Sequence, residues 1–373
     1  MTAEANKVTR RDFLKRGGTT LVVASAAAGA AAVLYDRTGK AGLRQPAAEK
    51  LPNYFAEVEH SVSAPRISVA RGADGSAETI DRLVRAAVGG LRGGKGLLGF
   101  ITKGDVVLLK PNVGFERAPA VGATTNPEVV RSIIRLCREA GAYKVIVADN
   151  PIEAAANCFA RSGIQAVAER EGARVILPAR VHFRPLAIRP PNADGSPYRP
   201  DPARHEALGT WEILWEPLRE ATKVIGIPPI KDHNLCYASM GMKNWYGLLG
   251  GRRNQFHQAI HDIVSDLGLM LSPTLMIADG TRVMMRNGPT GGSLADVKTA
   301  NTIVASVDPL ACDAWCYQNL LERDPAALSY LDLAQEKFGE QETGPRSYAL
   351  ARRFASRDVD GYRRRGLIVE QNV

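Results

Sequence analysis

Paired cysteines are missing from this chain. Its five cysteines are scattered, and no two stand in Cys-x-x-Cys spacing: Cys137, Cys158, Cys236, Cys312 and Cys316. This spacing excludes a ferredoxin-like iron–sulfur motif and a zinc ribbon, and an odd count is not that of a disulfide framework. We interpret the cysteines as buried free thiols, with one disulfide as the alternative in an oxidising compartment.

Long apolar runs and repeats are missing as well. The apolar stretch Leu21–Leu34 spans about 14 residues, which is short for a membrane-spanning helix. No segment repeats with a fixed period, and none outside the first 40 residues is of low complexity. The sequence therefore excludes a polytopic membrane protein, a fibrous protein and a disordered chain, and it indicates a globular protein.

Acidic residues are too few to balance the basic ones. The formal net charge is +9, but residues 1–40 hold seven Lys and Arg against three acids, so four of these charges belong to that segment and five to the rest. An excess of five charges suits a small anionic ligand and is weak support for a nucleic-acid surface. We expect no nucleic-acid partner.

The first 40 residues have the order of features of an export signal. Arg10 and Arg11 precede an apolar pair, a lysine and then a mildly apolar stretch rich in Ala and Gly. This order is typical of signal peptides, and the paired arginines indicate the twin-arginine (Tat) route. We expect a Tat signal at 1–40, a linker at 41–66, the Tat translocase as a partner and a periplasmic or otherwise extracytoplasmic protein. An uncleaved leader that anchors the protein to the membrane is the alternative.

Apolar runs of strand length alternate with helical patterns after residue 66. We expect strands at 67–70, 105–110, 144–149, 223–228, 275–279 and 302–308, and helices at 76–91, 126–140 and 254–271. Such alternation predicts an α/β fold, a mostly parallel sheet with helices on both faces. One domain should cover 67–373, with two lobes at about 67–180 and 220–330 as an alternative and a long Pro-rich excursion at 184–208.

Polar residues follow the predicted strands at their carboxyl ends. Asp149, Asp279 and Asp308 each end an apolar strand, and Lys110 and Asn112 end another. Ligands bind outside the carboxyl ends of strands in open α/β sheets, so these side chains are candidates for one site. The alternative for each aspartate is that it caps the following helix or turn.

Three histidines lie in the polar stretch from 230 to 267. His233 follows a strand, and His257 and His261 lie four residues apart on one flank of the predicted helix. Imidazoles one turn apart can share a metal, so we predict a zinc-type site of these three histidines. Asp308 is a further metal candidate, with Asp279, for a harder cation such as magnesium or calcium. The alternative is that the histidines merely edge an amphipathic helix.

Basic residues beside glycine-rich turns form a second candidate site. Gly250 and Gly251 precede Arg252 and Arg253 just before the predicted helix, an arrangement that can hold phosphates or carboxylates. The other predicted anion ligands are Lys110, Asn112 and Lys231. The glycines match neither the dinucleotide nor the P-loop fingerprint. The turn at 287–292 either adds backbone donors or is simply a turn.

Several ordered blocks resemble one known family. They are 105–112, 125–130, 141–149, 231–233, 243–247, 279–280, 287–292 and 308–313. Over about residues 65–320 they resemble the domain of unknown function family 362. The resemblance implies one site of Lys110, Asn112, His233, Lys243, Asn244, Asp279, Asp308 and Asp313, and it implies no activity. Some members carry a ferredoxin-like cysteine cluster, which this chain lacks, so no iron–sulfur cofactor is expected.

Three functions fit these observations. The first is an exported enzyme acting on an anionic small molecule or an envelope component, with or without a divalent metal. Its catalytic residues would be His233, Lys243, Asn244 and Asp279. His233 or His257 would act as acid or base, and Lys243 and Arg252 would hold the negative charge. The alternatives are an exported binding or assembly protein for a metal or anion, and a redox protein whose cofactor is inserted before export.

Overall fold

The computed structural model describes residues 51–52, 54–55, 64–91, 93–188, 196, 199–340 and 356–373. All of them belong to one compact unit, Ala48–Val373. The predicted leader with Arg10 and Arg11, and most of the predicted linker, lie outside the described residues.

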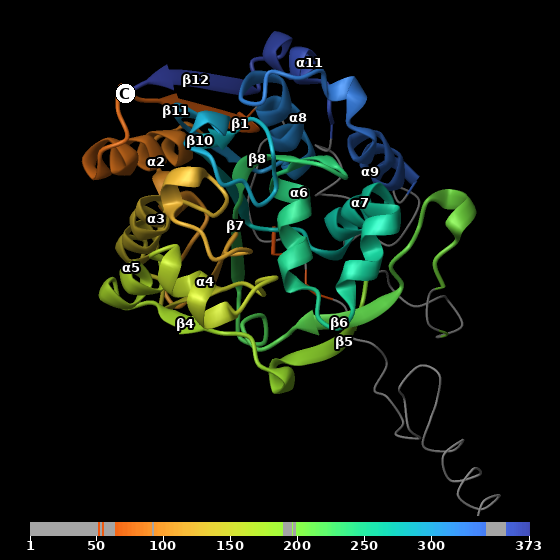
Figure 1. Ribbon diagram of the computed structural model, residues 1–373. Coiled ribbons are helices and arrows are strands. Elements are labelled where there is room, and N and C mark those ends of the chain that lie inside the picture. Colours follow the sequence, from red (N-terminus) through yellow and green to blue (C-terminus); the bar gives the residue numbers. More distant parts are fainter. Residues whose placement is uncertain are drawn as a thin grey trace, which may run out of the picture. The chain divides into compact units, whose positions relative to one another are not determined.

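A mixed, mostly parallel sheet runs through this unit (Figure 1). Its strand order is β12-β1-β11-β10-β7-β2-β3-β4, and β8 extends it by pairing with β10 and β9. β11 runs antiparallel to both of its neighbours, and β9 runs antiparallel to β8. The strands are β1 Ile67–Arg71, β2 Val106–Pro111, β3 Lys144–Ala148, β4 Arg174–Ile176, β7 Lys223–Ile227, β8 Pro229–His233, β9 Tyr237–Ser239, β10 Leu275–Met284, β11 Val297–Ser306 and β12 Ile368–Asn372.

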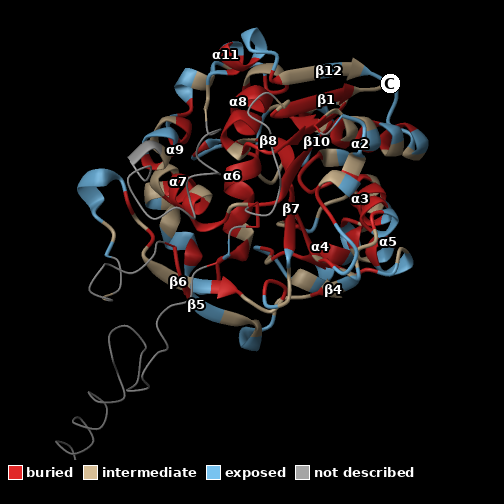
Figure 2. Cartoon of the chain, turned by 180° about the vertical axis from the view of Figure 1, so that it is seen from behind, coloured by how far each residue is buried: buried red, intermediate tan, exposed pale blue. Residues whose placement is uncertain are grey.

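Helices cover both faces of the sheet, as Figures 1 and 2 show. One face packs against α2 Ala77–Leu91, α3 Pro127–Glu139, α4 Ala155–Arg161 and α5 Ile164–Arg170. The other packs against α6 Gly241–Asn244, α7 Ile260–Met270, α8 Pro309–Asn319, α9 Ser329–Glu340 and α11 Val359–Arg364. Successive strand residues enter opposite cores, because side chains alternate along a strand: Leu108 lies in one core and Leu109 in the other. The predicted α/β fold with helices on both faces is confirmed.

The βαβ unit of β2, α3 and β3 positions the candidate site. Its strands are buried apolar runs, and its helix begins as the sequence predicts. The Asn126 side chain caps α3 by accepting a hydrogen bond from the Glu128 amide, and Pro127 takes the first helical position. Because β2 and β3 are parallel neighbours, their carboxyl ends open at the same edge.

The helix predicted at 254–271 is broken in two. Residues Arg253–Ala259 form a 3₁₀ helix, and α7 begins only at Ile260. Ala259, between them, has φ −131° and ψ 47°, which is not helical. The four-residue spacing of His257 and His261 therefore does not place them one above the other, and the prediction that they share a flank of one helix is wrong.

Two antiparallel strands flank the segment predicted as a Pro-rich excursion. β5 Phe183–Ala187 and β6 Thr210–Leu214 pair antiparallel in a separate two-stranded sheet. Residues 189–195 and 197–198, between them, are outside the described residues. Short 3₁₀ turns complete the elements: η1 Gly96–Gly99, η2 Pro119–Val121, η3 Arg180–His182, η4 Pro202–Arg204, η5 Trp245–Leu248, η7 Leu294–Asp296 and η8 Pro325–Ala327.

All five cysteines are buried and free. This matches the interpretation of the cysteines as core residues rather than as a disulfide framework. Within the described residues, no helix combines the length and the apolar character needed to cross a bilayer.

Candidate functional site

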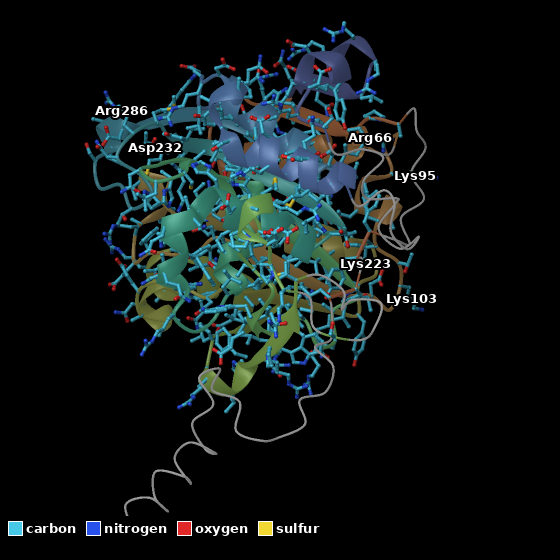
Figure 3. All side chains as sticks on the ribbon, turned by 90° about the vertical axis from the view of Figure 1, so that its right-hand side faces the viewer. Arg66, Lys95, Lys103, Lys223, Asp232 and Arg286 are labelled. Atoms are coloured by element: carbon cyan, nitrogen blue, oxygen red, sulfur yellow. The ribbon has the colours of Figure 1, made fainter. Side chains whose placement is uncertain are left out.

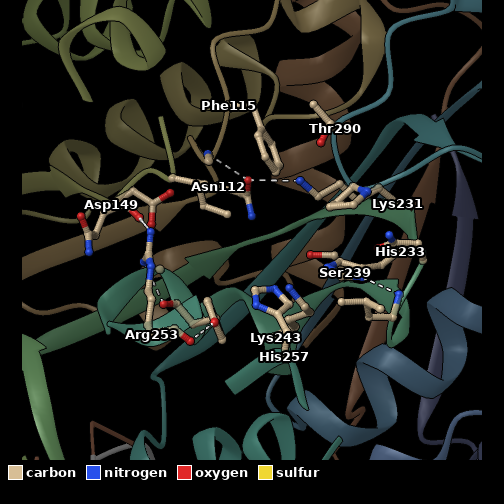
Figure 4. Close-up of a pocket in the computed structure, with 18 residues that line it drawn as sticks. Asn112, Phe115, Asp149, Lys231, His233, Ser239, Lys243, Arg253, His257 and Thr290 are labelled. Atoms are coloured by element: carbon tan, nitrogen blue, oxygen red, sulfur yellow. Dashed lines mark hydrogen bonds between the residues drawn. The ribbon is translucent and has the colours of Figure 1, made fainter. Parts of the chain in front are cut away.

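A cavity of about 190 Å³ opens at the carboxyl edge of β2 and β3. Residues after these strands line it, together with residues of β8, of the segment 234–257 and of the loop 289–290. Among its described lining residues, Lys231, Lys243 and Arg253 are cationic and one residue, Asp149, is acidic. Figure 4 shows these groups around a common space.

Lys110 lies beneath this cavity rather than in its wall. Its Nζ is 2.6 Å from Asp149 Oδ1, and it donates hydrogen bonds to Pro111 O at 2.9 Å and Asn244 Oδ1 at 3.0 Å. An ammonium has three protons, so these three oxygens satisfy it. Burial lowers its pKa, and the Asp149 carboxylate opposes that shift. Lys110 therefore has no proton left for an anion in the cavity, and the anion-binding role predicted for it is not supported.

The contacts of Asn244, like those of Lys110, hold the fold together and do not reach the cavity. Its amide nitrogen donates to Lys110 O at 2.9 Å while its oxygen accepts from Lys110 Nζ, so both ends of the amide tie α6 to β2. Asn244 is buried and does not line the cavity. We assign it a positioning role instead of the catalytic role predicted from the sequence.

Asp149 carries a charge that its own neighbours balance. One carboxylate oxygen pairs with Lys110, and the other accepts the Val113 amide at 2.6 Å. Gly247 makes the pair possible, because a Cβ at that position would overlap Asp149 Oδ1 and stand 2.5 Å from Lys110 Nζ. The remaining charge of the cavity wall is then the positive charge of Lys231, Lys243 and Arg253.

Lys231 is buried on β8 and reaches the cavity from the β10 side. Its Nζ donates to Ala123 O at 2.6 Å, lies 3.4 Å from Asn112 Oδ1 and stands 5.1 Å from the centre of the Phe115 ring. Burial first, and then repulsion from Lys243, lowers its pKa to about 7. Two of its three protons are engaged, which leaves one for a ligand.

Lys243 differs from the buried lysines Lys110, Lys231 and Lys337 in having no oxygen partner among the described residues. Within the described part of the chain, its ammonium makes a cation–π contact with Tyr246, 5.1 Å from the ring centre, and neither a hydrogen bond nor an ion pair. The residue is 9% exposed and lines the cavity. Burial lowers the pKa of Lys243, while Cys236 opposes that shift and Arg253 adds to it more weakly.

Asp313 holds the short helix that carries Lys243. Its carboxylate accepts the backbone amides of Gly241 at 2.7 Å and Met242 at 3.0 Å, and the Tyr330 hydroxyl at 3.0 Å. Burial raises its pKa to about 6. Asp313 belongs to the site's support, as the family resemblance implies, but it does not line the cavity.

Of the two arginines predicted to bind an anion, one is exposed and the other is buried. Arg252 is exposed and does not line the cavity, so the clamp predicted for it is not supported. Arg253 is buried and lines it. Its guanidinium donates to four backbone carbonyls, those of Asn150, Pro151, Tyr246 and Leu249, so it joins the loop after β3 to the segment after α6.

The three histidines predicted as metal ligands separate into two groups. His233 and His257 line the cavity, with their ring centroids 6.3 Å apart and their planes 18° from parallel. His261 does not line it and packs against Tyr237 and Tyr330, with ring centroids 5.7 and 6.3 Å away. No three His, Cys, Asp or Glu side chains of the described residues are grouped to hold a metal ion. The three-histidine arrangement predicted from helix spacing is therefore not what the structure has.

The two cavity histidines have complementary hydrogen bonds. The Leu235 amide donates to His233 Nδ1 at 3.1 Å, which assigns the proton of a neutral ring to Nε2. His257 Nδ1 lies 2.9 Å from Asn254 O, a contact that needs a proton on Nδ1 and leaves Nε2 as an acceptor. Burial and then Lys243 lower the pKa of His233 to about 2, so it stays neutral. His233 is a donor and His257 an acceptor.

Asp279 and Asp308 do not join the cavity. Asp279 accepts the Asn126 amide at 2.7 Å with one oxygen, and the amide and hydroxyl of Thr281 with the other. It thereby fixes the start of α3, and the catalytic role predicted for it is not supported. Asp308 caps α8 through the Ala311 amide and accepts the Tyr362 hydroxyl at 2.6 Å.

The direction of β11 explains where Asp308 lies. Asp308 follows β11, which runs antiparallel to β10, so its carboxyl end opens at the edge of the sheet opposite to the cavity. The prediction that Asp308 shares a site with Lys110 and Asn112 assumed a parallel strand and is wrong. For Asp279 and Asp308 alike, capping, the alternative read from the sequence, describes the contacts.

Sequence reasoning did not assign several residues of the wall. Phe115, Ser239 and Thr290 line the cavity, and of these only Thr290 lies in a segment that the sequence singled out, the turn at 287–292. Asp149 was noted as a strand end, but its pairing with Lys110 was not predicted. The signal was present, since the two residues end adjacent parallel strands and carry opposite charges.

Comparison with known proteins places the chain in a family. The family model Domain of unknown function (DUF362) matches residues 107–318. The chain belongs to the DUF362 family. The match includes β2, β3 and every side chain of the cavity wall discussed above.

Two known proteins are similar to this DUF362 chain. A thylakoid-associated protein of Synechocystis sp. is 30% identical over 256 residues, which cover 65% of this chain and 71% of the relative. The lactate racemase apoprotein from Thermoanaerobacterium thermosaccharolyticum is 13% identical, with a TM-score of 0.33 over 70% of this chain. The chain spans 60% of the length of that racemase. A likeness this weak assigns neither fold nor activity.

Proposed function

We propose that this protein is an exported enzyme acting on a small anionic molecule, which it binds in the cavity beside β2 and β3. The observation that carries the proposal is the Lys243 ammonium, which pairs with no anion among the described residues, in a wall that also holds Lys231 and Arg253. A buried cation without an anionic partner is costly, and a bound carboxylate or phosphate would supply that partner.

Hydrogen-bond donors around the cavity support the same ligand chemistry. Asn112 accepts with its amide oxygen from Gly114 and Lys231, which leaves its NH₂ group as a donor. His233 offers Nε2–H, and Lys231 has one proton free of protein partners. Several donors of fixed orientation and cations of low hydration are how proteins hold carboxylates and phosphates.

His257, which can act as an acid or a base, lies beside these donors. His257 Nε2 is the acceptor nitrogen of its ring, and the ring lies 5.5 Å from that of Tyr246, which also meets the Lys243 ammonium. A positioned imidazole can take a proton from a bound ligand and return it. Of the roles predicted from the sequence, His257 fits the base, and the neutral, proton-donating His233 fits ligand binding.

Phosphate, sulfate or a small dicarboxylate should raise the melting temperature of the protein, and Lys243→Gln should abolish the rise. A ligand at one hundred times its Kd adds about 2.7 kcal/mol to the folded state, which shifts the melting temperature by several degrees. Differential scanning fluorimetry with each sodium salt, matched in ionic strength with chloride, measures the effect.

Arg252→Gln is the matched control. It removes one positive charge nine residues from Lys243, but from an exposed side chain outside the cavity. The anion-dependent rise should persist in this variant. Equal rises in Lys243→Gln and the parent protein would place the anion elsewhere, and no rise in the parent protein would remove the basis of the proposed function.

Export is the second part of the proposal and depends on the leader. Arg10→Lys with Arg11→Lys should leave the protein folded but retained in the cytoplasm, because the Tat machinery reads the paired arginines. Cell fractionation of both forms measures it. Normal export of the double variant would contradict the twin-arginine route, and neither result affects the cavity.

A further inference from the structure

We propose that Lys243 is a carbonyl-reactive lysine that forms an imine with a small 2-oxo acid bound in the cavity. This inference rests on the proposed anion site and names the substrate class for it. The substrate's carboxylate would lie among the cations and donors of the wall, and its neighbouring carbonyl carbon would face Lys243 Nζ.

The contacts of Lys243 differ from those of the buried lysines Lys110, Lys231 and Lys337. Lys110 donates to oxygens of Pro111 and Asn244 and pairs with Asp149, and Lys337 has four oxygens within hydrogen-bond distance. Lys231 is fixed by Ala123 O. An amine held by such bonds cannot rotate its lone pair toward a ligand. Lys243, 9% exposed, lines the cavity without any such bond in the described chain.

The surroundings of Lys243 make its ammonium easier to deprotonate than that of an ordinary lysine, and the neutral amine is the nucleophile. Burial is the largest influence and lowers its pKa; Cys236 opposes this shift, and the guanidinium of Arg253 adds a smaller lowering. Desolvation beside another cation is the usual means by which proteins prepare a lysine for imine formation. The Tyr246 ring and the hydrophobic side chains Phe115 and Leu235 also line the cavity.

The donors of the wall fit a carboxylate next to a carbonyl. Lys231, the Asn112 NH₂ group and His233 Nε2–H are available for carboxylate oxygens. Burial and Lys243 lower the pKa of Lys231 to about 7, and a bound carboxylate would restore its charge. The space of about 190 Å³ is smaller than the 300–1,000 Å³ of sites for drug-sized ligands, so a metabolite of a few carbons fits it best.

Imine formation between Lys243 and the 2-oxo acid is not a redox reaction, so it consumes no oxidant, and it requires no metal. The Lys243 lone pair forms a bond to the carbonyl carbon, and the π electrons of the carbonyl move to its oxygen. A proton passes from nitrogen to that oxygen, with His257 Nε2 as the carrier, to give a carbinolamine. A second proton, taken up from solvent and delivered by His257, converts its hydroxyl to water, which leaves as the nitrogen lone pair forms the C=N bond. The products are one protonated imine and one water.

Borohydride trapping tests the proposal. The purified protein is incubated with pyruvate, glyoxylate or 2-oxoglutarate and sodium cyanoborohydride, and the adduct is located by peptide mass spectrometry. We expect one reduced adduct per chain on the peptide that contains Lys243, at least tenfold above that on the exposed Lys95 and Lys103, which are internal controls (Figure 3). Trapping at Lys243 should reach its plateau well below pH 10.4, the pKa of an ordinary lysine.

Two variants separate this inference from the anion site. Lys243→Arg keeps a cation but cannot form an imine, so it should lose trapping while phosphate still raises its melting temperature. Lys243→Gln should lose both. If the oxo acids stabilise the parent protein but none is trapped at Lys243, the imine is wrong and the anion site stands. If Lys243 reacts no faster than Lys103, the imine is also wrong. If no anion stabilises the parent protein, the proposed function itself fails.

Discussion

Replacing Asp149 with asparagine should lower the free energy of unfolding by about 3–5 kcal/mol. The variant keeps an oxygen for the Val113 amide but leaves the Lys110 ammonium without an anion in a place where the two side chains are 1% and 2% exposed. Removing one partner of a buried pair is costly because the other charge remains desolvated. Equilibrium unfolding in urea, with the m-value checked for constancy, measures the loss.

A double-mutant cycle shows whether the loss comes from the pair. Lys110→Met removes the cation with a side chain of similar length, and Lys110→Met with Asp149→Asn should be less destabilised than the sum of the single variants by about 1–3 kcal/mol. The control is an exposed pair: Glu139→Gln breaks the contact with Arg85, whose side chain is 40% exposed, and should cost no more than about 1 kcal/mol. Additive losses at Lys110 and Asp149 would contradict a coupled pair.

The layered fold could be predicted because a strand that is buried on both faces of its sheet is a nearly continuous apolar run in the sequence. Val106–Pro111 and Lys144–Ala148 are nearly continuous apolar runs, and the helix between them has a cap, a first-turn proline and one apolar face. The direction of β11 was missed because apolar content carries no direction. The connection from Met284 to Val297 is rich in turn residues, which favours a hairpin over a helical crossover.

The members of the site could be predicted better than their roles. Strand ends and the family resemblance pointed to Lys110, Asn112, His233 and Lys243, and all four lie in or directly below the cavity. What separates Lys110 from Lys243 is whether three oxygens surround the ammonium, and two of those oxygens come from residues 39 and 134 positions away. Such contacts have no local pattern in the sequence.

Local geometry limited the prediction for the basic and histidine residues. Arg252 and Arg253 are neighbours in sequence, yet one is exposed and the other donates to four carbonyls. The pairing of His257 with His261 assumed 3.6 residues per turn, and the 3₁₀ helix ending at Ala259 removed that relation. A sequence pattern of the right residues does not reveal such a break.

Gly247→Ala should destabilise the protein strongly, although it adds only one methyl group beside the cavity. The new Cβ would overlap Asp149 Oδ1 and stand 2.5 Å from Lys110 Nζ, so the ion pair, the Gly247 backbone or both must move. The Gly247 carbonyl also accepts the Asn150 amide at 2.9 Å, which ties this segment to the loop after β3. We expect a loss of about 3 kcal/mol or more in unfolding free energy, from overpacking and a disturbed buried pair.

Gly89→Ala is the matched control for this prediction, since it adds the same methyl group in α2 with its nearest neighbour, Gly94 Cα, at an ordinary 3.9 Å. That variant should gain about 0.5–1 kcal/mol, as alanine favours a helix more than glycine does. The Gly247 variant should in addition lose the melting-temperature rise with phosphate, because the displaced segment carries Tyr246 and adjoins Lys243 in the cavity wall. Normal stability together with an unchanged phosphate effect would mean that Lys110 and Asp149 tolerate separation, and that the cavity wall does not depend on their close approach to this glycine.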